Sequence, residues 1–513
     1  MQSLKGFVGY TKKTLSVKDT YAVRANSVAL GMSLDTFIEV VGFAVADEIG
    51  RNRKNKSIAV VCGRGEKGAC GLSTARHLLR TANVSVFFIG DPSTINNNTT
   101  RLNYNLVKNV IEIRNIGEEQ AEQLAKSLAK FDVIVDAILG CGLKGRLSSL
   151  LTKAITAINK SGREVLSIDI PSGLDADTGM PNRAYVKADH TFVIHKMKQG
   201  IERNKLVGST TLVNVGVPIA AELFAGPGDV MLATEPRPMQ ANKYTHGRIL
   251  IIGGSKDYHG APLIAAFAAE NTMSALLSGA GYATIAVPAE VVEPVRKLSM
   301  ELIVKPLDLG NTAAAISAIS AIKHDALVIG PGMEQSEEND RMILEIIKSE
   351  KAKGNTIIVD ADATRVMAKH KDMLSKNIVL TPHDGEFRNF SGINLKGLTP
   401  EERIRKAIGV AKPRGFTLVL KGNETVITNG ELLKINRSET PALATIGTGD
   451  ALDGIIASYS AVHKNSFESA VAAVYVHSRV GDMLYSKKGL HITSQDVLSG
   501  IPDVLKQFDT LRF

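Results

Sequence analysis

The sequence of 513 residues contains little that would mark a secreted or membrane protein. It has three cysteines, an odd number, with no Cys-x-x-Cys pair, which argues against a disulfide scaffold and against a zinc site. Its first residues lack the apolar core of a signal peptide. The longest apolar stretch, residues 280–292, is interrupted by Gly281, Pro288 and Glu290 and is no membrane span. We therefore expect a protein of the reducing cytoplasm with no membrane partner.

The sequence also lacks a pattern for binding nucleic acids, although its formal net charge is +9. Lysine and arginine are scattered, and the only locally basic segment, residues 51–56, is typical of a solvated connection. We expect no nucleic-acid partner, and a positive surface would instead attract anionic nucleotides. With 22% charged and 44% hydrophobic residues the composition is ordinary for a globular protein. The length is too great for one core and favours about two to four domains.

The most informative segment is Ile446–Ile456, in which Gly447, Thr448 and Gly449 precede Asp450 and an apolar run with helical character. Glycines let backbone N–H groups turn inward, and a helix start adds the positive end of its dipole, so the segment predicts an anion site. A phosphate would repel a carboxylate there, which favours a chemical role for the acid: accepting a proton from a hydroxyl during phosphoryl transfer. The alternative is a glycine-rich helix cap with the acid in the first turn.

Polar clusters follow four apolar runs of the C-terminal half, each typical of a buried strand. These clusters are Gly330–Gly332, Asp360–Asp362, Thr381–Glu386 and Lys421–Asn423. In an open α/β sheet, ligands bind at the carboxyl ends of the strands, where these clusters would lie. One such cluster could be an ordinary loop, but several in series indicate a site.

The C-terminal half resembles the ribokinase-like superfamily and, within it, the nicotinamide nucleotide hydrate dehydratases, over about residues 237–505. The motifs that carry the resemblance occur in the family's order: Gly-Gly-Ser at 253–255, Gly-Pro-Gly at 330–332, Asp-Ala-Asp-Ala at 360–363, Thr-Pro-His-x-Gly-Glu at 381–386, Leu-Lys-Gly at 420–422 and Gly-Thr-Gly-Asp at 447–450. Such an ordered set is far more specific than any single motif. Glu334 departs from the family, which usually has glycine there, and this predicts a reshaped substrate pocket.

By this resemblance, the C-terminal domain phosphorylates the hydroxyl added across the nicotinamide ring, using Mg²⁺ and ADP or ATP, with ADP favoured. Phosphate is a better leaving group than hydroxide, and the lone pair of the ring nitrogen can expel it. Asp450 would be the catalytic base. The segment Lys421–Thr425 would lie along the ADP phosphates or ribose, Gly449 at the adenosine phosphate end, and His383 on the nicotinamide side. The implied binding residues are Ala261, Gly332, His383, Lys421, Gly422, Asn423, Glu424, Thr425, Gly447, Thr448 and Gly449.

The N-terminal half has a glycine-rich turn of its own, Gly63–Gly68, between an expected strand at 57–62 and an expected helix at 72–82. The next expected strand, 84–89, leads to Asp91. This arrangement fits a dinucleotide-binding fingerprint and makes a dehydrogenase one alternative.

Two further expected strands end in Asp136 and Asp169. Asp169 runs into a glycine- and acid-rich turn at 170–179, which a dehydrogenase would not need. One interpretation of Asp169 is a helix or turn cap. The other is the acid/base group of a second site, because it can reach a ligand held by the neighbouring glycine turns.

This half resembles the nicotinamide nucleotide hydrate epimerase domain over about residues 14–225. The family's Asp-Ala-x-x-Gly-x-Gly segment is present at 136–142, Asp-Ile-Pro-Ser-Gly is intact at 169–173, and the opening helix pattern matches loosely at 37–42. The phosphate turn of the family reads Gly-x-Gly-Asn-Asn-Gly-Gly-Asp-Gly. Here residues 63–71 read Gly-Arg-Gly-Glu-Lys-Gly-Ala-Cys-Gly, so both asparagines and the aspartate are lost.

By this resemblance, the N-terminal domain interconverts the two epimers of the hydrated nucleotide, with Asp169 as its acid/base group. The family holds potassium with the second asparagine of the turn and with residues that correspond to Asp136 and Ser172. Lys67 stands in place of that asparagine and supplies the same charge, so it could replace potassium, which puts the potassium site and the epimerase activity in question. The implied substrate-binding residues are Glu66, Lys67, Gly68, Ala69, Cys70, Gly140, Cys141, Gly142, Leu143, Lys144, Gly145 and Arg146.

We predict an α/β protein of two domains: a Rossmann-like three-layer domain at 1–225 and a ribokinase-like domain at 226–513, joined near Gly226–Gly228. The predicted function is repair of hydrated NADH and NADPH (NADHX and NADPHX), by epimerisation and by ADP-dependent dehydration, and we expect a homo-oligomer. Two alternatives stay open. One is a small-metabolite kinase of the hydroxyethylthiazole or pyridoxal type with a regulatory N-terminal domain. The other is an N-terminal half that only binds or dimerises.

Overall fold

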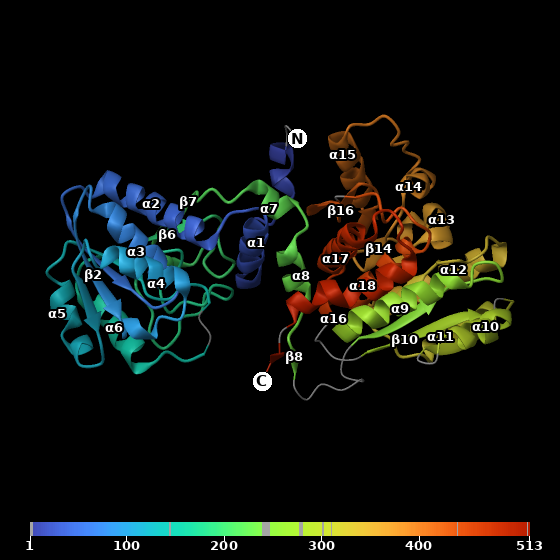
Figure 1. Ribbon diagram of the computed structural model, residues 1–513, viewed down its shortest axis with the longest axis horizontal. Helices are drawn as coiled ribbons and strands as arrows, with labels where there is room; N and C mark the ends of the chain where they lie inside the picture. The colour runs from blue at the N-terminus through green and yellow to red at the C-terminus, as the bar shows by residue number, and fades with distance from the viewer. Residues whose placement is uncertain are drawn as a thin grey trace. The chain divides into compact units, whose positions relative to one another are not determined.

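The computed structural model describes residues 4–142, 145–238, 247–275, 281–299, 302–308, 310–438, 440–509 and 511–512. The chain forms two compact units, each with its own sheet (Figure 1). The first unit runs from Lys12 to Pro218, and the second comprises the residues up to Thr11 together with those from Ile219 onward. The sequence placed the join near Gly226–Gly228; in the structure, the segment from Ile219 already belongs to the second unit. The α/β class predicted for both halves is confirmed.

The first unit is built on a seven-stranded parallel sheet with the strand order β3-β2-β1-β4-β5-β6-β7. The chain places β2 and β3 on one side of β1 and then β4 to β7 on the other, so the order reverses between β1 and β4. Ligands bind at such a reversal in doubly wound sheets. The strands are β1 (Ser57–Cys62), β2 (Asn83–Ile89), β3 (Ile113–Ile116), β4 (Val133–Ala137), β5 (Glu164–Ile168), β6 (His190–Ile194) and β7 (Ser209–Val213).

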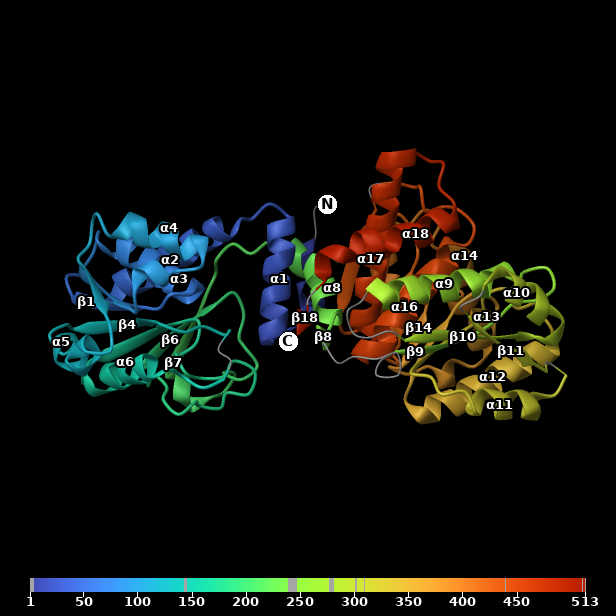
Figure 2. The same ribbon diagram turned by 60° about the horizontal axis from the view of Figure 1, so that its bottom comes forward.

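Helices cover both faces of this sheet, which explains why its central strands are apolar almost throughout. One core lies between the sheet and α2, α3 and α4, and another lies between the sheet and α5 and α6 (Figure 2). The helices are α1 (Val17–Ala29), α2 (Leu34–Asn52), α3 (Glu66–Leu78), α4 (Asn98–Val107), α5 (Leu124–Leu128) and α6 (Ser149–Lys160).

Helix α3 begins six residues earlier than the helix predicted at 72–82, so the predicted start was wrong. The glycines after Gly65 lie inside the helix, where they allow close packing. A Cβ at Gly68 would collide with the carbonyl oxygen of Gly63, and one at Gly71 would collide with Ala137. These glycines therefore serve helix–sheet packing, which a glycine-rich sequence does not distinguish from a turn.

The second unit is built on a nine-stranded sheet with the order β11-β10-β9-β12-β13-β14-β15-β16-β17. Strands β9 to β15 pair in parallel, and β16 and β17 extend the edge in antiparallel. The strands are β9 (Arg248–Ile252), β10 (Tyr282–Pro288), β11 (Ile303–Leu307), β12 (Ala326–Ile329), β13 (Thr356–Val359), β14 (Ile378–Leu380), β15 (Thr417–Leu420), β16 (Glu424–Thr428) and β17 (Leu433–Arg437), and a separate pair is formed by β8 (Arg237–Pro238) and β18 (Leu511–Arg512).

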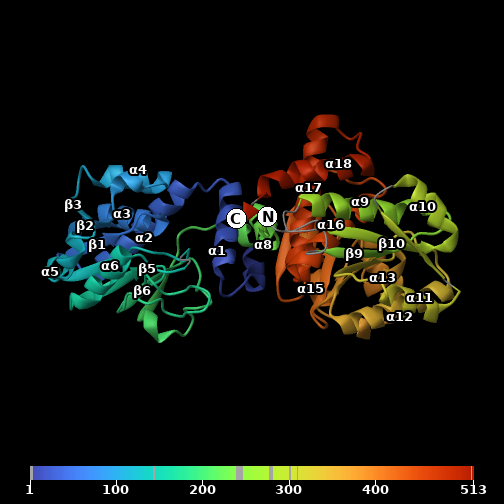
Figure 3. The ribbon, with the colours of Figure 1, turned by 90° about the horizontal axis from the view of Figure 1, so that it is seen from below.

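Two helical layers enclose this sheet (Figure 3). Residues of α8 to α10 and α16 to α18 form one core with it, and residues of α11 to α15 form the other. The helices are η1 (Leu4–Tyr10), α7 (Ile219–Leu223), α8 (Pro227–Ala233), α9 (Gly260–Ala275), α10 (Val292–Leu298), α11 (Thr312–Ser320), α12 (Glu337–Lys353), α13 (Ala361–Lys369), α14 (Asp384–Ser391), α15 (Pro400–Ala411), α16 (Thr448–His463), α17 (Ser466–Lys488) and α18 (Ser494–Leu505).

No single helix among the described residues has the length and apolarity needed to cross a membrane. The pair α1 and α2, bent by 114°, passes that test only when the two helices are taken together.

Candidate active sites

Helix α16 begins at the glycine-rich turn predicted from the sequence. Gly447 caps it with φ of +85°, a left-handed conformation that favours glycine. Thr448 fixes the turn, because its one hydroxyl proton faces the carbonyl oxygens of Leu443 and Thr445, which lie 2.7 and 2.8 Å from Oγ1. The first turn of a helix presents backbone N–H groups and the positive end of the dipole. This helix start is therefore suited to an anion.

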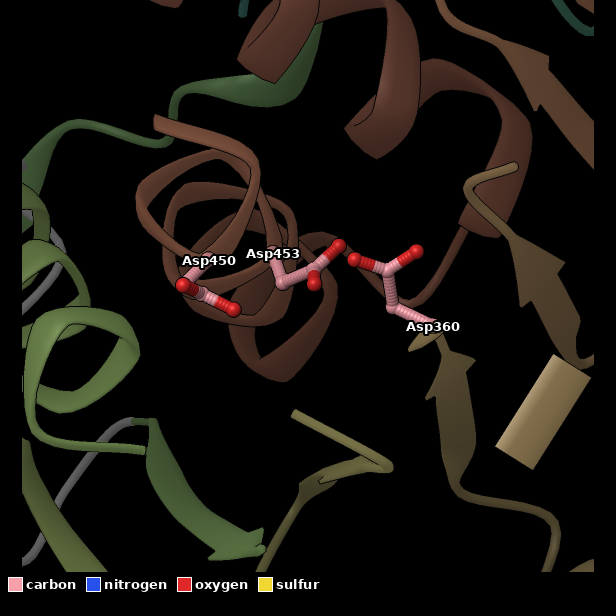
Figure 4. Close-up of side chains that lie close together, drawn as sticks. All are labelled: Asp360, Asp450 and Asp453. Carbon is pink, nitrogen blue, oxygen red and sulfur yellow. The ribbon is translucent and has the colours of Figure 1, made fainter. Parts of the chain in front are cut away.

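Three carboxyl groups meet beside this turn, those of Asp360, Asp450 and Asp453 (Figure 4). Asp360 follows β13, whereas Asp450 and Asp453 lie one turn apart on α16 and share one face of it. One oxygen from each carboxyl lies within 4.8 Å of the others. Asp453 is fully buried and accepts a hydrogen bond from Thr381 Oγ1 at 3.0 Å. Sheet and helix together thus gather three acids at one point.

Lys421, at the end of β15, lies against one of these acids. Its Nζ is 3.1 and 3.3 Å from the two carboxylate oxygens of Asp360. Burial opposes the charge of the ammonium, but the neighbouring carboxylate of Asp360 raises the pKa of Lys421 above its ordinary value. Burial likewise opposes ionisation of Asp360, but Lys421 and a hydrogen bond from Asp453 lower its pKa. Lys421 and Asp360 therefore form a charged pair inside the protein.

The other two acids hold their protons more tightly. Burial, followed by the charge of Asp360, raises the pKa of Asp450 to about 7. The same two causes raise the pKa of Asp453 well above its ordinary value. A carboxyl group with a pKa near neutrality can both accept and return a proton. Asp450 thus has the properties of a general base placed next to an anion site.

The structure divides the predicted segment Lys421–Thr425. The ammonium of Lys421 lies in the acid cluster, whereas Gly422 and Asn423 are exposed at the β15–β16 turn. Thr425 closes this turn, since its Oγ1 donates to the carbonyl oxygen of Gly422 at 3.0 Å. The cation and the hairpin tip therefore lie in different surroundings.

Other predicted contacts of this half lie on helix starts and turns. Ala261 is in the first turn of α9, and a Cβ added to Gly332 would press against it, so the two are neighbours. His383 caps α14: its Nδ1 accepts a hydrogen bond from the N–H of Gly385 at 3.0 Å. The side chain of His383 is 61% exposed, and its Nε2 lies 3.5 Å from Glu386 Oε1.

The first unit contains a cavity of about 480 Å³ beyond the carboxyl ends of β1, β4, β5 and β6, where α1 and α2 also contribute. Of the predicted residues, it is lined by Glu66, Lys67, Cys70, Gly140, Cys141, Gly142 and Asp169. Gly68 and Ala69 are buried within α3, and Gly145 and Arg146 are exposed; none of these four is among the described lining residues. Leu143 and Lys144 lie outside the described residues.

Asp169 adopts a left-handed conformation at this cavity, with φ of +64°, which residues with a side chain rarely adopt. Its N–H donates to the carbonyl oxygen of Phe192 (2.8 Å), and its carboxylate accepts a hydrogen bond from the N–H of Ile194 (3.2 Å). The ammonium of Lys198 contacts the same carboxylate and also donates to the carbonyl oxygen of Ile194 at 2.8 Å. Lys198 is only 1% exposed and lines the cavity. Backbone strain of this kind gathers at functional sites.

Lys67 meets both residues that the sequence assigned to potassium. Its Nζ donates to Asp136 Oδ2 at 2.9 Å and to Ser172 Oγ at 3.1 Å. Another cation, Arg24 on α1, pairs with Glu66 in the cavity wall. Burial and then the charge of Asp169 raise the pKa of Cys141 to about 11, so this residue is a thiol at neutral pH.

Known protein families match both halves of the chain. A family model described as NAD(P)H-hydrate dehydratase matches residues 249–503, and one described as YjeF-related protein N-terminus matches residues 34–200. The bifunctional NAD(P)H-hydrate repair enzyme Nnr of Hyperthermus butylicus is 34% identical over 96% of this chain and 92% of its own length. The chain belongs to the family of bifunctional NAD(P)H-hydrate repair enzymes. This confirms the resemblance seen in the sequence.

Other relatives match nearly the whole chain or about half of it. The Nnr enzyme of Methanothermobacter thermautotrophicus is 32% identical over 95% of this chain and 94% of its own length. Among solved structures, the ADP/ATP-dependent NAD(P)H-hydrate dehydratase of Bacillus subtilis, co-crystallised with ATP/Mg²⁺, is 26% identical. It covers 56% of this chain and 99% of its own, with a TM-score of 0.46.

Two residues of the candidate sites were not predicted from the sequence. Asp453 carried a signal, because it lies one turn after Asp450 on the same helix. Lys198 carried a weaker one, as a lysine that follows the short apolar run 192–194. Its pairing with Asp169 depends on β5 and β6 being neighbours, which only the fold establishes.

Proposed function

We propose that the second unit dehydrates hydrated NAD(P)H by phosphorylating its ring hydroxyl, and that the first unit epimerises the carbon bearing that hydroxyl. Family membership supports the substrate, and Asp450 supports the chemistry. A carboxyl group with a pKa of about 7, in the first turn of a helix that can hold phosphate, combines the base and the anion site that phosphoryl transfer requires.

In the proposed dehydration, Asp450 removes the proton of the ring hydroxyl as the hydroxyl oxygen attacks the terminal phosphorus of ADP. The phosphorus–oxygen bond to AMP breaks, and backbone N–H groups at the start of α16 stabilise the transferred phosphoryl group. The lone pair of the ring nitrogen then expels phosphate, and loss of a proton from the adjacent carbon restores the double bond of NAD(P)H. The products are NAD(P)H, AMP and phosphate.

A divalent cation fits the acid cluster. Carboxylate oxygens are the ligands that Mg²⁺ prefers beside phosphates, and Asp360 and Asp453 would hold it. When bound, Mg²⁺ supplies positive charge against the phosphates of the donor. Lys421 remains on Asp360 and keeps that carboxyl ionised.

In the proposed epimerisation, Asp169 protonates the hydroxyl oxygen, and water leaves as the lone pair of the ring nitrogen forms a carbon–nitrogen double bond. Water then adds to the opposite face of the same carbon and returns a proton to Asp169. Lys198 is a positioning residue, since its ammonium holds the carboxylate of Asp169 toward the cavity. Lys198→Met is expected to lower kcat for epimerisation by about 10–100-fold with little change in KM, and Lys198→Arg to restore part of it. Equal losses in both variants, with unfolding at a lower temperature, would assign Lys198 to the fold alone.

The assay that tests the proposal supplies the S epimer of NADHX with ADP and Mg²⁺ and follows the return of NADH absorbance together with AMP. Wild-type protein should form NADH, AMP and phosphate in equal amounts, and so should the control Asp372→Asn, whose side chain is exposed. The proposal fails if ADP is consumed without NADH. Consumption of nucleotide only with hydroxyethylthiazole or pyridoxal would instead establish a small-metabolite kinase.

A further inference from the structure

The side chain of Lys67 is buried in a cage of oxygen atoms, with only 5% of its surface exposed. Its Nζ lies 2.6 Å from the carbonyl oxygen of Ile170, 2.9 Å from Asp136 Oδ2 and 3.1 Å from Ser172 Oγ. These acceptors come from the end of β4 and from the turn after β5. A carbonyl, a carboxylate and a hydroxyl are also the oxygen ligands that surround a hard cation in proteins.

The carboxylate in this cage is built to face a positive charge. Asp136 is 0% exposed, and it also accepts hydrogen bonds from Ser167 Oγ (2.9 Å), the N–H of Ser172 (2.8 Å) and the N–H of Ile138 (3.2 Å). Ser172 Oγ donates to its second oxygen at 2.6 Å. A buried carboxylate with this many donors is costly without a cation, and the ammonium of Lys67 provides one.

The cage does not fit a dissociable metal ion as it stands, because the ammonium already lies among the three oxygens. We propose that Lys67 is a tethered cation that occupies a latent monovalent-cation site, so that the first unit works without potassium. An ammonium group and K⁺ carry the same charge and accept the same oxygen neighbours. Shortening the side chain should open the site to an ion from solution.

The position of the cage explains why a cation matters there. Ile170 follows Asp169 directly, so the hydrogen bond from Lys67 fixes the turn that carries this acid. Ser172 Oγ, whose one proton goes to Asp136, also accepts a hydrogen bond from the N–H of Leu139 (2.8 Å). Leu139 begins the Gly140–Gly142 wall of the cavity. The tethered cation thus joins α3 to two walls of the cavity, and this part of the inference rests on the proposed epimerase function.

The first test requires no substrate. Thermal unfolding of Lys67→Asn is measured in KCl and in choline chloride at the same ionic strength of about 0.15 M, beside the wild type and Lys126→Asn, an exposed lysine of the same unit. We expect KCl to raise the Tm of Lys67→Asn by about 5 °C and to leave the other two proteins unchanged. An unchanged Tm of folded Lys67→Asn in KCl would overturn the inference, as would a rise in the wild type.

Anomalous diffraction gives a second measurement, and its wild-type arm does not depend on whether the variant folds. Crystals of the wild type and of Lys67→Asn are soaked in Rb⁺, whose anomalous signal identifies the ion. We expect a Rb⁺ peak between Asp136 and Ser172 in the variant and none there in the wild type. A Rb⁺ peak at this place in the wild type would overturn the inference whatever happens to the variant.

Kinetics then separates this inference from the proposed function. The R epimer of NADHX is supplied with ADP, so that conversion faster than the spontaneous rate reports epimerisation. The rate of conversion by the wild type should not depend on K⁺. In Lys67→Asn, adding K⁺ should raise this rate at least about tenfold. If the wild type does not convert the R epimer but the ion responses of Lys67→Asn appear, the tethered cation stands and the epimerase function falls. Potassium-dependent conversion by the wild type would overturn the tethered cation itself.

Discussion

At the scale of single residues, Asp450 shows how burial prepares a carboxyl group for proton transfer. Burial and the charge of Asp360 raise its pKa to about 7, so the fraction that can accept a proton grows as the pH rises toward neutrality. We therefore expect kcat/KM for dehydration to rise with pH and to level off above about pH 7. Asp450→Asn should bind ADP but lose about 10²–10⁴-fold in kcat. Stopped-flow dehydration assays across the pH range would check both, and turnover near that of the wild type would remove Asp450 as the base.

The same substitution predicts a change in stability with a definite sign. The pKa of Asp450 is higher in the folded protein than its ordinary value of 3.8, so the folded state binds a proton that the unfolded state releases between these values. The wild type loses this contribution as the pH rises toward 7, and Asp450→Asn does not. The difference in the free energy of unfolding between Asp450→Asn and the wild type should therefore shift in favour of the variant by about 2–4 kcal/mol from pH 4 to pH 8. Urea unfolding at both pH values measures this difference, and a constant difference would contradict it.

Asp360 offers a second pH-dependent prediction, because its charge acts against that of Lys421 at Asp450. Asp360→Asn removes the negative neighbour and leaves the ammonium, so the pKa of Asp450 should fall. The rising limb of the pH–rate profile should move to lower pH by about one unit. Glu386→Gln, which removes a carboxyl with a smaller effect on Asp450, is the matched control and should move the limb less. A shift to higher pH in Asp360→Asn would refute this account of the cluster.

Residues were predictable from the sequence when their chemistry depended on neighbours along the chain. Asp450 follows its own glycine turn, and Asp169 follows its own strand, so both could be proposed from the sequence, and their catalytic roles stay predictions. The contacts of Lys67 with Asp136 and Ser172 agree with its predicted place, although its role remains a proposal. The pair of Lys421 and Asp360 was not found, because it depends on which strand ends lie side by side.

At the scale of elements, the start of α16 depends on one backbone conformation. Gly447 has φ of +85°, and a Cβ there would press on Ile264 and Ser494. Gly447→Ala should therefore lower the free energy of unfolding by about 1–3 kcal/mol. It should also lower the rate of dehydration, because the turn that presents the N–H groups must shift. Gly354→Ala is a matched control: Gly354 has φ of +79° after α12, with open space around its Cβ position. The control should lose about 1 kcal/mol and keep its activity, and equal activity losses would contradict a special role for the α16 turn.

The strands were predicted better than the helices. Continuous apolar runs are typical of parallel strands covered on both faces, and the strand expected at 57–62 coincides with β1. The helix after it was placed too late, because glycines that serve packing look like glycines that form turns. The order of the strands within each sheet was not predictable, since it depends on crossovers that leave no local pattern.

At the scale of the whole molecule, the two units do not divide the chain at a single point. Residues up to Thr11 belong to the second unit, where Phe7 is 1% exposed within a core that also contains Leu223 and Ile404. The guanidinium of Arg405 lies 5.1 Å from the centre of the Phe7 ring. The predicted first domain, 1–225, included these residues because a chain end carries no sign of the core it joins. That contact joins residues far apart in the sequence and can be seen only in the fold.

Phe7 therefore yields a prediction about which activity the N-terminal residues support. Phe7→Ala should destabilise the second unit by about 3–5 kcal/mol, because a buried aromatic ring is lost from its core. Calorimetry with and without ADP identifies the transition of the second unit, since the nucleotide raises the Tm of the unit that binds it. In Phe7→Ala, only the midpoint temperature of that transition should fall. On heating, the variant should lose its dehydration activity at a lower temperature than its epimerisation activity. Phe43→Ala, whose ring is 55% exposed in the first unit, should change neither transition. If Phe7→Ala lowered the other transition instead, residues 4–11 would support the first unit and their assignment to the second core would be wrong.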